Sequence, residues 1–169
     1  MKNFLMICLV CLLFGQTFSA FAQNDCVYKK NETDPITGKV VRELESRQLT
    51  TEKDFYNDFV VTLKRIGDNR YLEIFSMLSG TELDQKECIM KLRNGSILRF
   101  RDIYPTRSTN SFEMKILLKP TEVVKLKESP VVLIRGINVN ASELDRVFVD
   151  YYISVENSRY FIEKLKCLD

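Results

Sequence analysis

One stretch decides the fold class: Glu87-Cys-Ile-Met-Lys-Leu-Arg93-Asn94-Gly95-Ser96-Ile-Leu-Arg-Phe-Arg-Asp-Ile103. An Asn-Gly pair separates two strand-like runs, and such a pair suits the two positive-φ positions of a type I′ turn. The stretch therefore predicts a β-hairpin with strands over 87–93 and 96–103. A plain two-residue turn would place the apolar Met90 opposite the charged Arg99. A β-bulge that shifts the pairing of the two strands is therefore an alternative.

Further strand-like runs, separated by turn residues, lie on both sides of this hairpin. Upstream we expect a polar, turn-rich segment over 27–38, a mostly polar edge strand over 39–49, and a hairpin of 55–66 and 70–78 around Gly67. Downstream we expect a loop over 104–110 and strands over 112–118, 131–138 and 144–153. The strand over 131–138 should be central, because its first four residues are all apolar.

A short segment between two of these strands carries conflicting signals. Pro120 near a first turn favours a helix over Glu122–Glu128, whereas the β-branched pair Val123-Val124 favours a strand. We expect the helix, because Ser129-Pro130 follows as a stop signal.

The last segment has one apolar helix face, since Phe161, Leu165 and Leu168 recur at i, i+4 and i+7. Ser154 can cap this helix. The expected fold is therefore α+β: a single, mainly antiparallel β-sheet domain of about seven or eight strands. It has one short internal helix and a C-terminal amphipathic helix that covers one face of the sheet.

The first 22 residues have the pattern of an export signal. Lys2 supplies a positive charge, Phe4–Phe14 is an apolar run, and Ala20-Phe21-Ala22 is a small-x-small cleavage site. The run is shorter than the roughly 20 residues that a membrane-spanning helix needs. We expect a cleaved signal peptide over 1–22 and one domain over 23–169, exported to the periplasm or secreted, with no later transmembrane segment. An anchor that stays uncleaved is the alternative.

Three cysteines remain after this cleavage: Cys26, Cys88 and Cys167. Cys88 lies in a strand-like run and should be a small core residue. Because the two ends of a domain often lie close together, Cys26–Cys167 is the preferred disulfide. Three reduced thiols are the alternative.

The composition excludes several common types of catalytic and metal-binding site. The chain has no histidine, which excludes Ser-His-Asp and Cys-His nucleophiles and removes the commonest zinc ligand. No glycine-rich phosphate loop is present. We therefore expect no catalytic residue, no metal and no cofactor. The net charge of +2 gives no reason to expect a nucleic-acid partner.

Basic residues cluster from Lys91 to Arg107, against Asp102 alone. They are Lys91, Arg93, Arg99, Arg101 and Arg107. This cluster could bind a phosphate, a sulfated sugar or an acidic protein. The plainer interpretation is a solvated strand face whose charges protect a sheet edge.

Two other functions have weaker support. A hydrolase could use paired carboxylates, for which the sequence offers Glu32/Asp34, Glu52/Asp54 and Asp54/Asp58. A protease inhibitor could present the loop over 104–110. The sequence favours a non-catalytic, monomeric binding domain whose partner is an extracytoplasmic protein, an envelope component or an anionic ligand.

The opening of the expected domain has a recognisable motif, Cys26-Val-Tyr28-Lys-Lys-Asn31-Glu32-Thr-Asp34-Pro-Ile-Thr37-Gly38-Lys39. It resembles the opening of small exported proteins of Bacteroidota, in which Cys-x-Tyr precedes Asn-Glu-x-Asp-x-x-Thr-Gly-Lys. The resemblance covers residues 26–39 and implies residence in the envelope or outside the cell. That family has no assigned activity, so the resemblance brings no catalytic residues.

Overall fold

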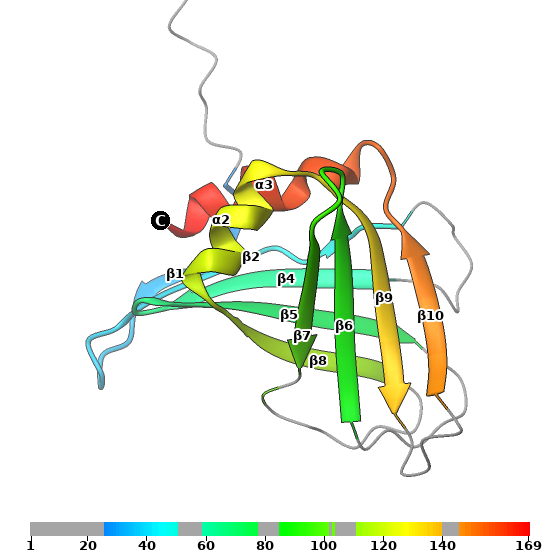
Figure 1. The fold of residues 1–169 in the computed structure, drawn as a ribbon. Coiled ribbons are helices and arrows are strands. Elements are labelled where there is room, and N and C mark those ends of the chain that lie inside the picture. The colour runs from blue at the N-terminus through cyan, green and yellow to red at the C-terminus, as the bar shows by residue number, and fades with distance from the viewer. Residues whose placement is uncertain (1–25, 51–58, 78–84, 102, 104–110, 140–145) are drawn as a thin grey trace, which may run out of the picture.

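The computed structural model describes residues 26–50, 59–77, 85–101, 103, 111–139 and 146–169. In this part of the chain ten strands form two antiparallel sheets, and helices lie at one end of them (Figure 1). The α+β class is confirmed, although the strands are divided between two sheets. The expected signal peptide over 1–22 and the expected loop over 104–110 lie outside the described residues.

Sheet A has six strands in the order β1-β2-β4-β5-β8, with β3 paired to β4. They are β1 (Tyr28–Thr33), β2 (Val40–Leu44), β3 (Arg47–Gln48), β4 (Phe59–Ile66), β5 (Asn69–Met77) and β8 (Ser111–Leu118). Two expectations were wrong. The segment over 27–38 is not all turn, because it contains β1. The segment over 39–49 is not an edge, because β2 lies between β1 and β4.

A polar strand can occupy this inner position because its buried carboxylate is neutralised. Glu43 pairs with Lys29 at 2.9 Å and with Lys64 at 3.0 Å, from the strands on either side. Burial alone would raise the pKa of Glu43, but hydrogen bonds from the two lysines outweigh it and hold the pKa below its ordinary range.

Sheet B has four strands in the order β10-β9-β6-β7. They are β6 (Gln85–Leu92), β7 (Ile97–Arg101), β9 (Val131–Val139) and β10 (Arg146–Tyr152). The predicted hairpin of β6 and β7 is confirmed, and so is the central position of β9.

The turn of this hairpin differs from the expected type I′ turn. Gly95 has a φ of 86°, but Asn94 does not have a positive φ. The N–H of Gly95 donates to Leu92 O at 3.0 Å, and the N–H of Leu92 donates to Ser96 O at 2.9 Å. This is the three-residue loop of a type I turn closed by a glycine bulge. The bulge shifts the register, so Met90 lies opposite Leu98 and not opposite Arg99.

The core lies between the two sheets, whose strands cross (Figure 1). Side chains alternate between the faces of a strand. In β4, for example, Phe59, Val61 and Leu63 are buried and the residues between them are not. The sheets meet at one corner, where the N–H of Ile103 donates to Lys115 O of β8 at 2.9 Å.

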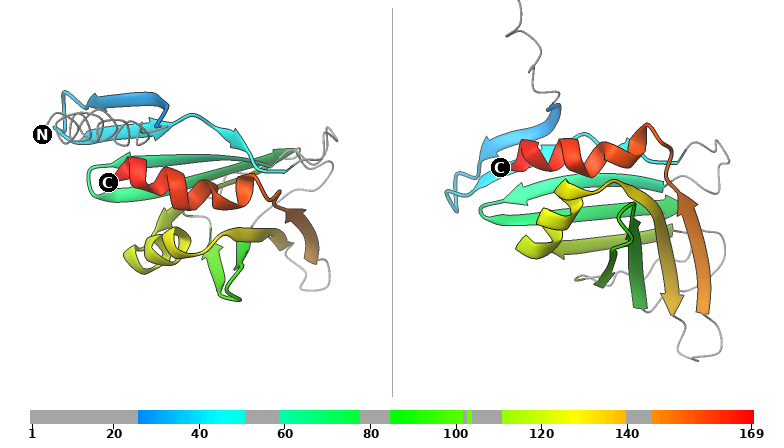
Figure 2. Two further views of the ribbon diagram at one scale, coloured as in Figure 1. Left: turned by 90° about the horizontal axis from the view of Figure 1, so that it is seen from above. Right: turned by 45° about the horizontal axis from the view of Figure 1, so that its top comes forward.

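Helical segments close one end of the sandwich (Figure 2). They are α2 (Pro120–Glu128), η1 (Asn157–Arg159), α3 (Tyr160–Lys164) and η2 (Leu165–Leu168). The internal helix is confirmed and buries Val123 and Leu126. The predicted apolar face of the last segment is also confirmed, because Phe161, Leu165 and Leu168 are all buried. The hydroxyl of Ser154 accepts a hydrogen bond from the N–H of Asn157 at 3.2 Å, as expected of a cap.

The last helical segment is tied to the first strands. Cys26 and Cys167 form the predicted disulfide, and Cys88 is a buried free cysteine. The hydroxyl of Tyr28 donates to Cys167 O at 2.7 Å, and Arg65 donates to Leu168 O at 3.0 Å. Among the described residues, no helix is long and apolar enough to cross a membrane.

Candidate functional site

Sheet B turns a basic face away from the core. In β7, Leu98 and Phe100 are buried, so the alternation sends Ile97, Arg99 and Arg101 outward. The pairing of β7 with β6, and of β6 with β9, sets the outward residues in rows. We define the basic face by these outward residues: Glu87, Ile89, Lys91, Ile97, Arg99, Arg101, Leu133 and Arg135.

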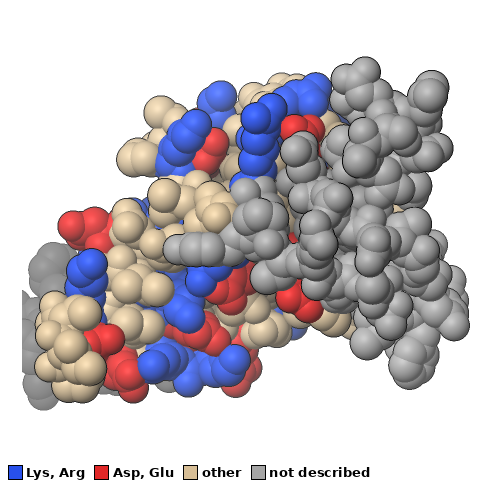
Figure 3. All heavy atoms as spheres, turned by 90° about the horizontal axis from the view of Figure 1, so that it is seen from below, with Lys and Arg blue, Asp and Glu red and all other residues tan. Residues whose placement is uncertain are grey.

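The structure places four of the five predicted ligand-binding residues on this hairpin. Lys91, Arg99 and Arg101 lie on the basic face, and Arg93 lies in the turn at its end. Arg107 lies outside the described residues. In Figure 3 blue side chains outweigh the red ones between them in the upper part of the view, whereas blue and red alternate at the lower left.

One basic residue of the face was missed from the sequence. Arg135 comes from β9, and only the pairing of β6 with β9 brings it opposite Ile89, whose other neighbour is Arg99. β6 and β9 are far apart in the sequence, and no local sequence pattern indicates how two such strands are aligned.

The cations of the hairpin and Arg135 of β9 differ in how they are neutralised. Arg101 pairs with Glu87 at 3.2 Å, and Arg135 makes two bonds to Asp150, at 2.5 and 2.6 Å. The hydrogen bond from Arg135 lowers the pKa of Asp150 below its ordinary range. Within the described part of the chain, no ion pair involves any of three exposed residues: Lys91, Arg93 and Arg99. Five cations thus stand against two carboxylates, a local charge of +3.

Two hollows flank Arg99. One, of about 210 Å³, lies on the basic face itself and has both apolar and basic lining residues, Ile89, Lys91, Ile97, Arg99, Leu133 and Arg135. The other, of about 440 Å³, lies between β7, β8 and the start of α2, and we call it the corner groove. Its lining residues are Glu87, Arg99, Phe100, Arg101, Ile103, Ile116, Leu117, Lys119 and Glu122. Arg99 lines both hollows, so an anion held there would have apolar surface on either side.

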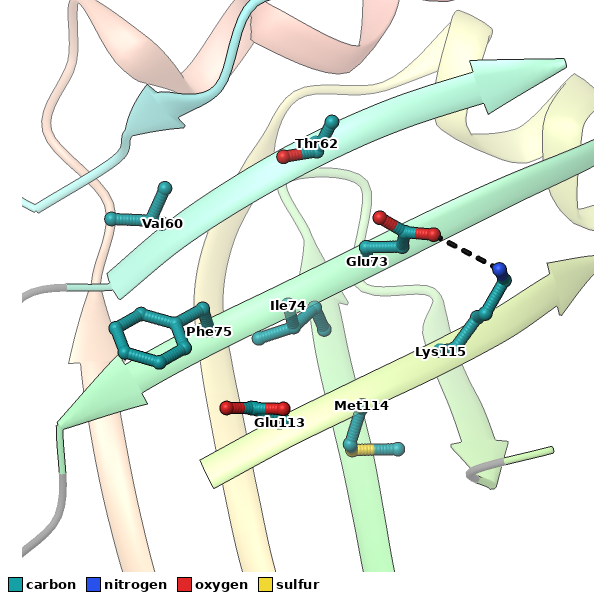
Figure 4. A pocket seen from close by; sticks show the side chains of 8 residues that line it. All are labelled: Val60, Thr62, Glu73, Ile74, Phe75, Glu113, Met114 and Lys115. Carbon is teal, nitrogen blue, oxygen red and sulfur yellow. Dashed lines mark ion pairs between the residues drawn. The ribbon is translucent and has the colours of Figure 1, made fainter. Parts of the chain in front are cut away.

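A third hollow, of about 540 Å³, lies on the outer face of sheet A (Figure 4). Val60 and Phe75 supply apolar surface, and Lys115 pairs with Glu73 at 3.1 Å. Glu113 lies beside them, two residues before Lys115 on β8 and opposite Phe75. No local pattern in the sequence indicates this cluster, because Glu73 and Glu113 lie 40 residues apart in different strands.

The carboxylates of this hollow are poorly arranged for acid–base catalysis. A carboxylate pair that acts as acid and base needs one member kept protonated by its surroundings. Here Glu73 is already engaged in an ion pair with Lys115.

Of the carboxylate pairs named from the sequence, Glu32/Asp34 lies within the described residues, and both of its carboxylates serve local structure. Asp34 Oδ1 accepts hydrogen bonds from the N–H groups of Thr37 and Ile36, at 2.8 and 2.9 Å, and these bonds lower its pKa. Asp34 therefore shapes the β1–β2 turn. Glu32 pairs with Lys30 at 2.8 Å. The pairs Glu52/Asp54 and Asp54/Asp58 lie outside the described residues.

The described residues offer little evidence for a catalytic nucleophile or a metal-binding site. Cys88 is completely buried, and burial raises the pKa of its thiol. A buried thiol in apolar surroundings is inert, because the thiolate is the reactive form. No cluster of three or more potential metal-binding side chains occurs in the described ranges.

No protein-family model, curated protein or solved structure matches this chain. The candidate site therefore stands on its geometry.

Proposed function

We propose that this protein is an exported, non-catalytic binding domain that binds an anionic ligand on the basic face. The ligand is either a protein or an envelope component. The observation that carries the proposal is the surroundings of Arg99. Its guanidinium belongs to a face of net positive charge, has no ion-pair partner among the described residues, and lines two hollows with apolar surface. A planar guanidinium beside apolar surface suits carboxylate, sulfate and phosphate groups.

Binding is favoured over the hydrolase alternative by the state of the carboxylates. Glu43 is paired with two lysines, and Asp150 with Arg135. Paired carboxylates are stabilised in their charged form and are poor general acids.

The proposal is tested by retention of residues 23–169 on immobilised poly-L-glutamate and on immobilised heparin, eluted with salt. The double variant Arg99→Ala/Arg101→Ala should elute at clearly lower salt, because exposed charge contacts are screened over about 8 Å at physiological ionic strength. Both side chains are exposed, so the fold should be unaffected.

The matched control removes two charges elsewhere. Lys125 on α2 and Lys166 on η2 are exposed and lie outside the basic face. Lys125→Ala/Lys166→Ala should elute close to the unchanged protein. Equal losses in the two double variants would show that retention follows net charge alone, and the proposed site would be abandoned.

Export is supported by the signal pattern over 1–22, by the resemblance of residues 26–39 to exported proteins, and by a disulfide between Cys26 and Cys167. Mass spectrometry of the exported protein should find an N-terminus at Gln23. An intact Met1 in the exported fraction would rule out this processing.

A further inference from the structure

We infer that the anionic ligand is an extended acidic segment of a protein, which binds by adding a strand to sheet B along β7. This inference rests on the proposed function and specifies its partner. It depends on three features of the described residues: an open strand edge, the spacing of the cations on that edge, and the groove beside it.

Among the described residues, no strand pairs with the outer edge of β7, and the bonding of this edge to β8 begins at Ile103, whose N–H donates to Lys115 O. β7 is the terminal strand of the order β10-β9-β6-β7. The N–H of Leu92 donates to Ser96 O, so this pair is hydrogen-bonded. Hydrogen-bonded pairs alternate along an antiparallel ladder. Leu98 and Phe100 therefore point their backbone groups at β6, whereas those of Ile97, Arg99 and Arg101 point to the open edge.

A hydrogen bond on the β9 side of β6 agrees with this alternation of backbone directions. The N–H of Arg93 donates to Pro130 O at 2.8 Å, just before β9. The odd-numbered residues of β6 thus point toward β9 and the even-numbered ones toward β7. Among the described residues, no backbone hydrogen bond beyond the β6 pairing involves any of three edge residues: Ile97, Arg99 and Arg101.

The side chains on this edge define the composition of the added strand. Arg99 and Arg101 are two residues apart on one face, so the residues opposite them in an added strand would also be two apart. Acidic residues at these alternate positions would meet the two guanidinium groups.

The corner groove accounts for the other face of the added strand. Ile116 and Leu117 of β8 and the ring of Phe100 line it, with Lys119 and Glu122 as the charged residues at its α2 end. A segment in which apolar residues alternate with acidic ones fits both faces. A main-chain ladder supplies affinity in such complexes, and alternate side chains supply specificity.

Two synthetic peptides test the inference. One is fluorescein-labelled and alternates valine with glutamate over eight residues. The other has the same sequence with alternate backbone nitrogens methylated, which removes the N–H groups that a ladder needs. The first should bind residues 23–169, and the methylated peptide should bind at least about fivefold more weakly, the loss expected from one hydrogen bond. A heparin fragment serves as the purely anionic comparison.

A matched pair of variants tests the same point on the protein. Ile97→Pro removes an edge N–H without touching the β6 ladder, and proline is tolerated on edge strands in this orientation. Ile97→Ala removes the same side chain but keeps the N–H. The peptide should bind Ile97→Pro at least about fivefold more weakly than Ile97→Ala. Heparin should bind the two variants equally.

The outcomes separate the two proposals. If Arg99→Ala/Arg101→Ala leaves both peptide and heparin binding unchanged, the proposed function fails. If that double variant weakens binding, but the methylated peptide and Ile97→Pro behave like their controls, only strand addition is overturned. Binding of heparin without binding of the peptide likewise overturns it. Should circular dichroism show that Ile97→Pro is unfolded, the comparison of the two peptides decides alone.

Discussion

The hydroxyl groups of Ser76 and Tyr151 share a buried hydrogen bond of 2.8 Å that joins the two sheets. Ser76 belongs to β5 of sheet A and Tyr151 to β10 of sheet B. The Tyr151 ring also packs on Phe59, with 4.5 Å between ring centroids. Burial raises the pKa of Tyr151, so the hydroxyl stays protonated at neutral pH and is free to donate.

A double-mutant cycle should reveal this link between the sheets. Tyr151→Phe leaves the Ser76 hydroxyl buried without its partner, and Ser76→Ala does the same to Tyr151. Each should lower the free energy of unfolding by about 1–2 kcal/mol. The double variant should lose less than the sum, because no unpaired hydroxyl remains. Urea unfolding measures the three losses, and strict additivity would mean that the two hydroxyls are not coupled.

The disulfide should dominate the stability of the oxidised protein. Cys26 and Cys167 are 141 residues apart, and closing so long a loop contributes up to about 4–5 kcal/mol in the chain-entropy model. Replacing both by alanine should lower the free energy of unfolding by up to this amount. In residues 23–169, a thiol reagent should find no reactive thiol in the folded state and one, Cys88, after denaturation. Three reactive thiols would contradict the bridge.

The β6–β7 turn should depend on the backbone of Gly95. Its φ is 86°, and no described heavy atom beyond Gly95 and its two chain neighbours lies within 4 Å of the position that a Cβ would occupy. Gly95→Ala should therefore lower the free energy of unfolding by about 1–2 kcal/mol through backbone strain alone, without a steric clash. Gly95→Asn should cost less, because asparagine tolerates this region better. Equal costs in urea unfolding would point to another cause.

The carboxylate of Asp169 should make the stability of the fold depend on pH in the acidic range. It lies 2.7 Å from Lys127 and 3.1 Å from Arg70, and the hydrogen bond from Lys127 is the main reason that its pKa is below its ordinary value of 3.8. Because folding lowers this pKa, the charged carboxylate stabilises the fold at pH values above its ordinary pKa. This contribution is lost as the pH falls through the lower pKa of the folded state. Because Asp169 is half exposed, its contribution should be no more than about 1 kcal/mol.

Asp169→Asn provides the measurement. The variant should be less stable than the unchanged protein at pH 7, and the difference should vanish as the pH falls through the lowered pKa of Asp169. Lys127→Met should behave similarly, whereas Lys125→Met on the same helix is the control and should not. A difference that persists unchanged into acid would exclude the ion pair as its cause.

The sequence predicted most elements whose signals are local. Asn94-Gly95 located the β6–β7 turn, although a single positive φ at Gly95 replaced the expected pair. The spacing of Phe161, Leu165 and Leu168 located the buried face of the last helical segment. In each case a few neighbouring residues determine the conformation.

Elements that depend on distant partners were misjudged. β1 is polar along its whole length, so it has no strand pattern of its own and forms by pairing with β2. The division into two sheets depends on which strands pair across long connections, as β5 does with β8 and β6 with β9. For the same reason Arg135 and the hollow on sheet A could not be found from the sequence, whereas Lys91, Arg99 and Arg101 could.

The bridge between Cys26 and Cys167 also determines how the domain meets mechanical load. A pull applied outside these two cysteines passes through one covalent bond and bypasses every strand and helix between them. Neither sheet can be peeled from its ends while the bond is intact. Reduction returns the load to β1 and to the last helical segment, so resistance to stretching would fall to that of their non-covalent contacts.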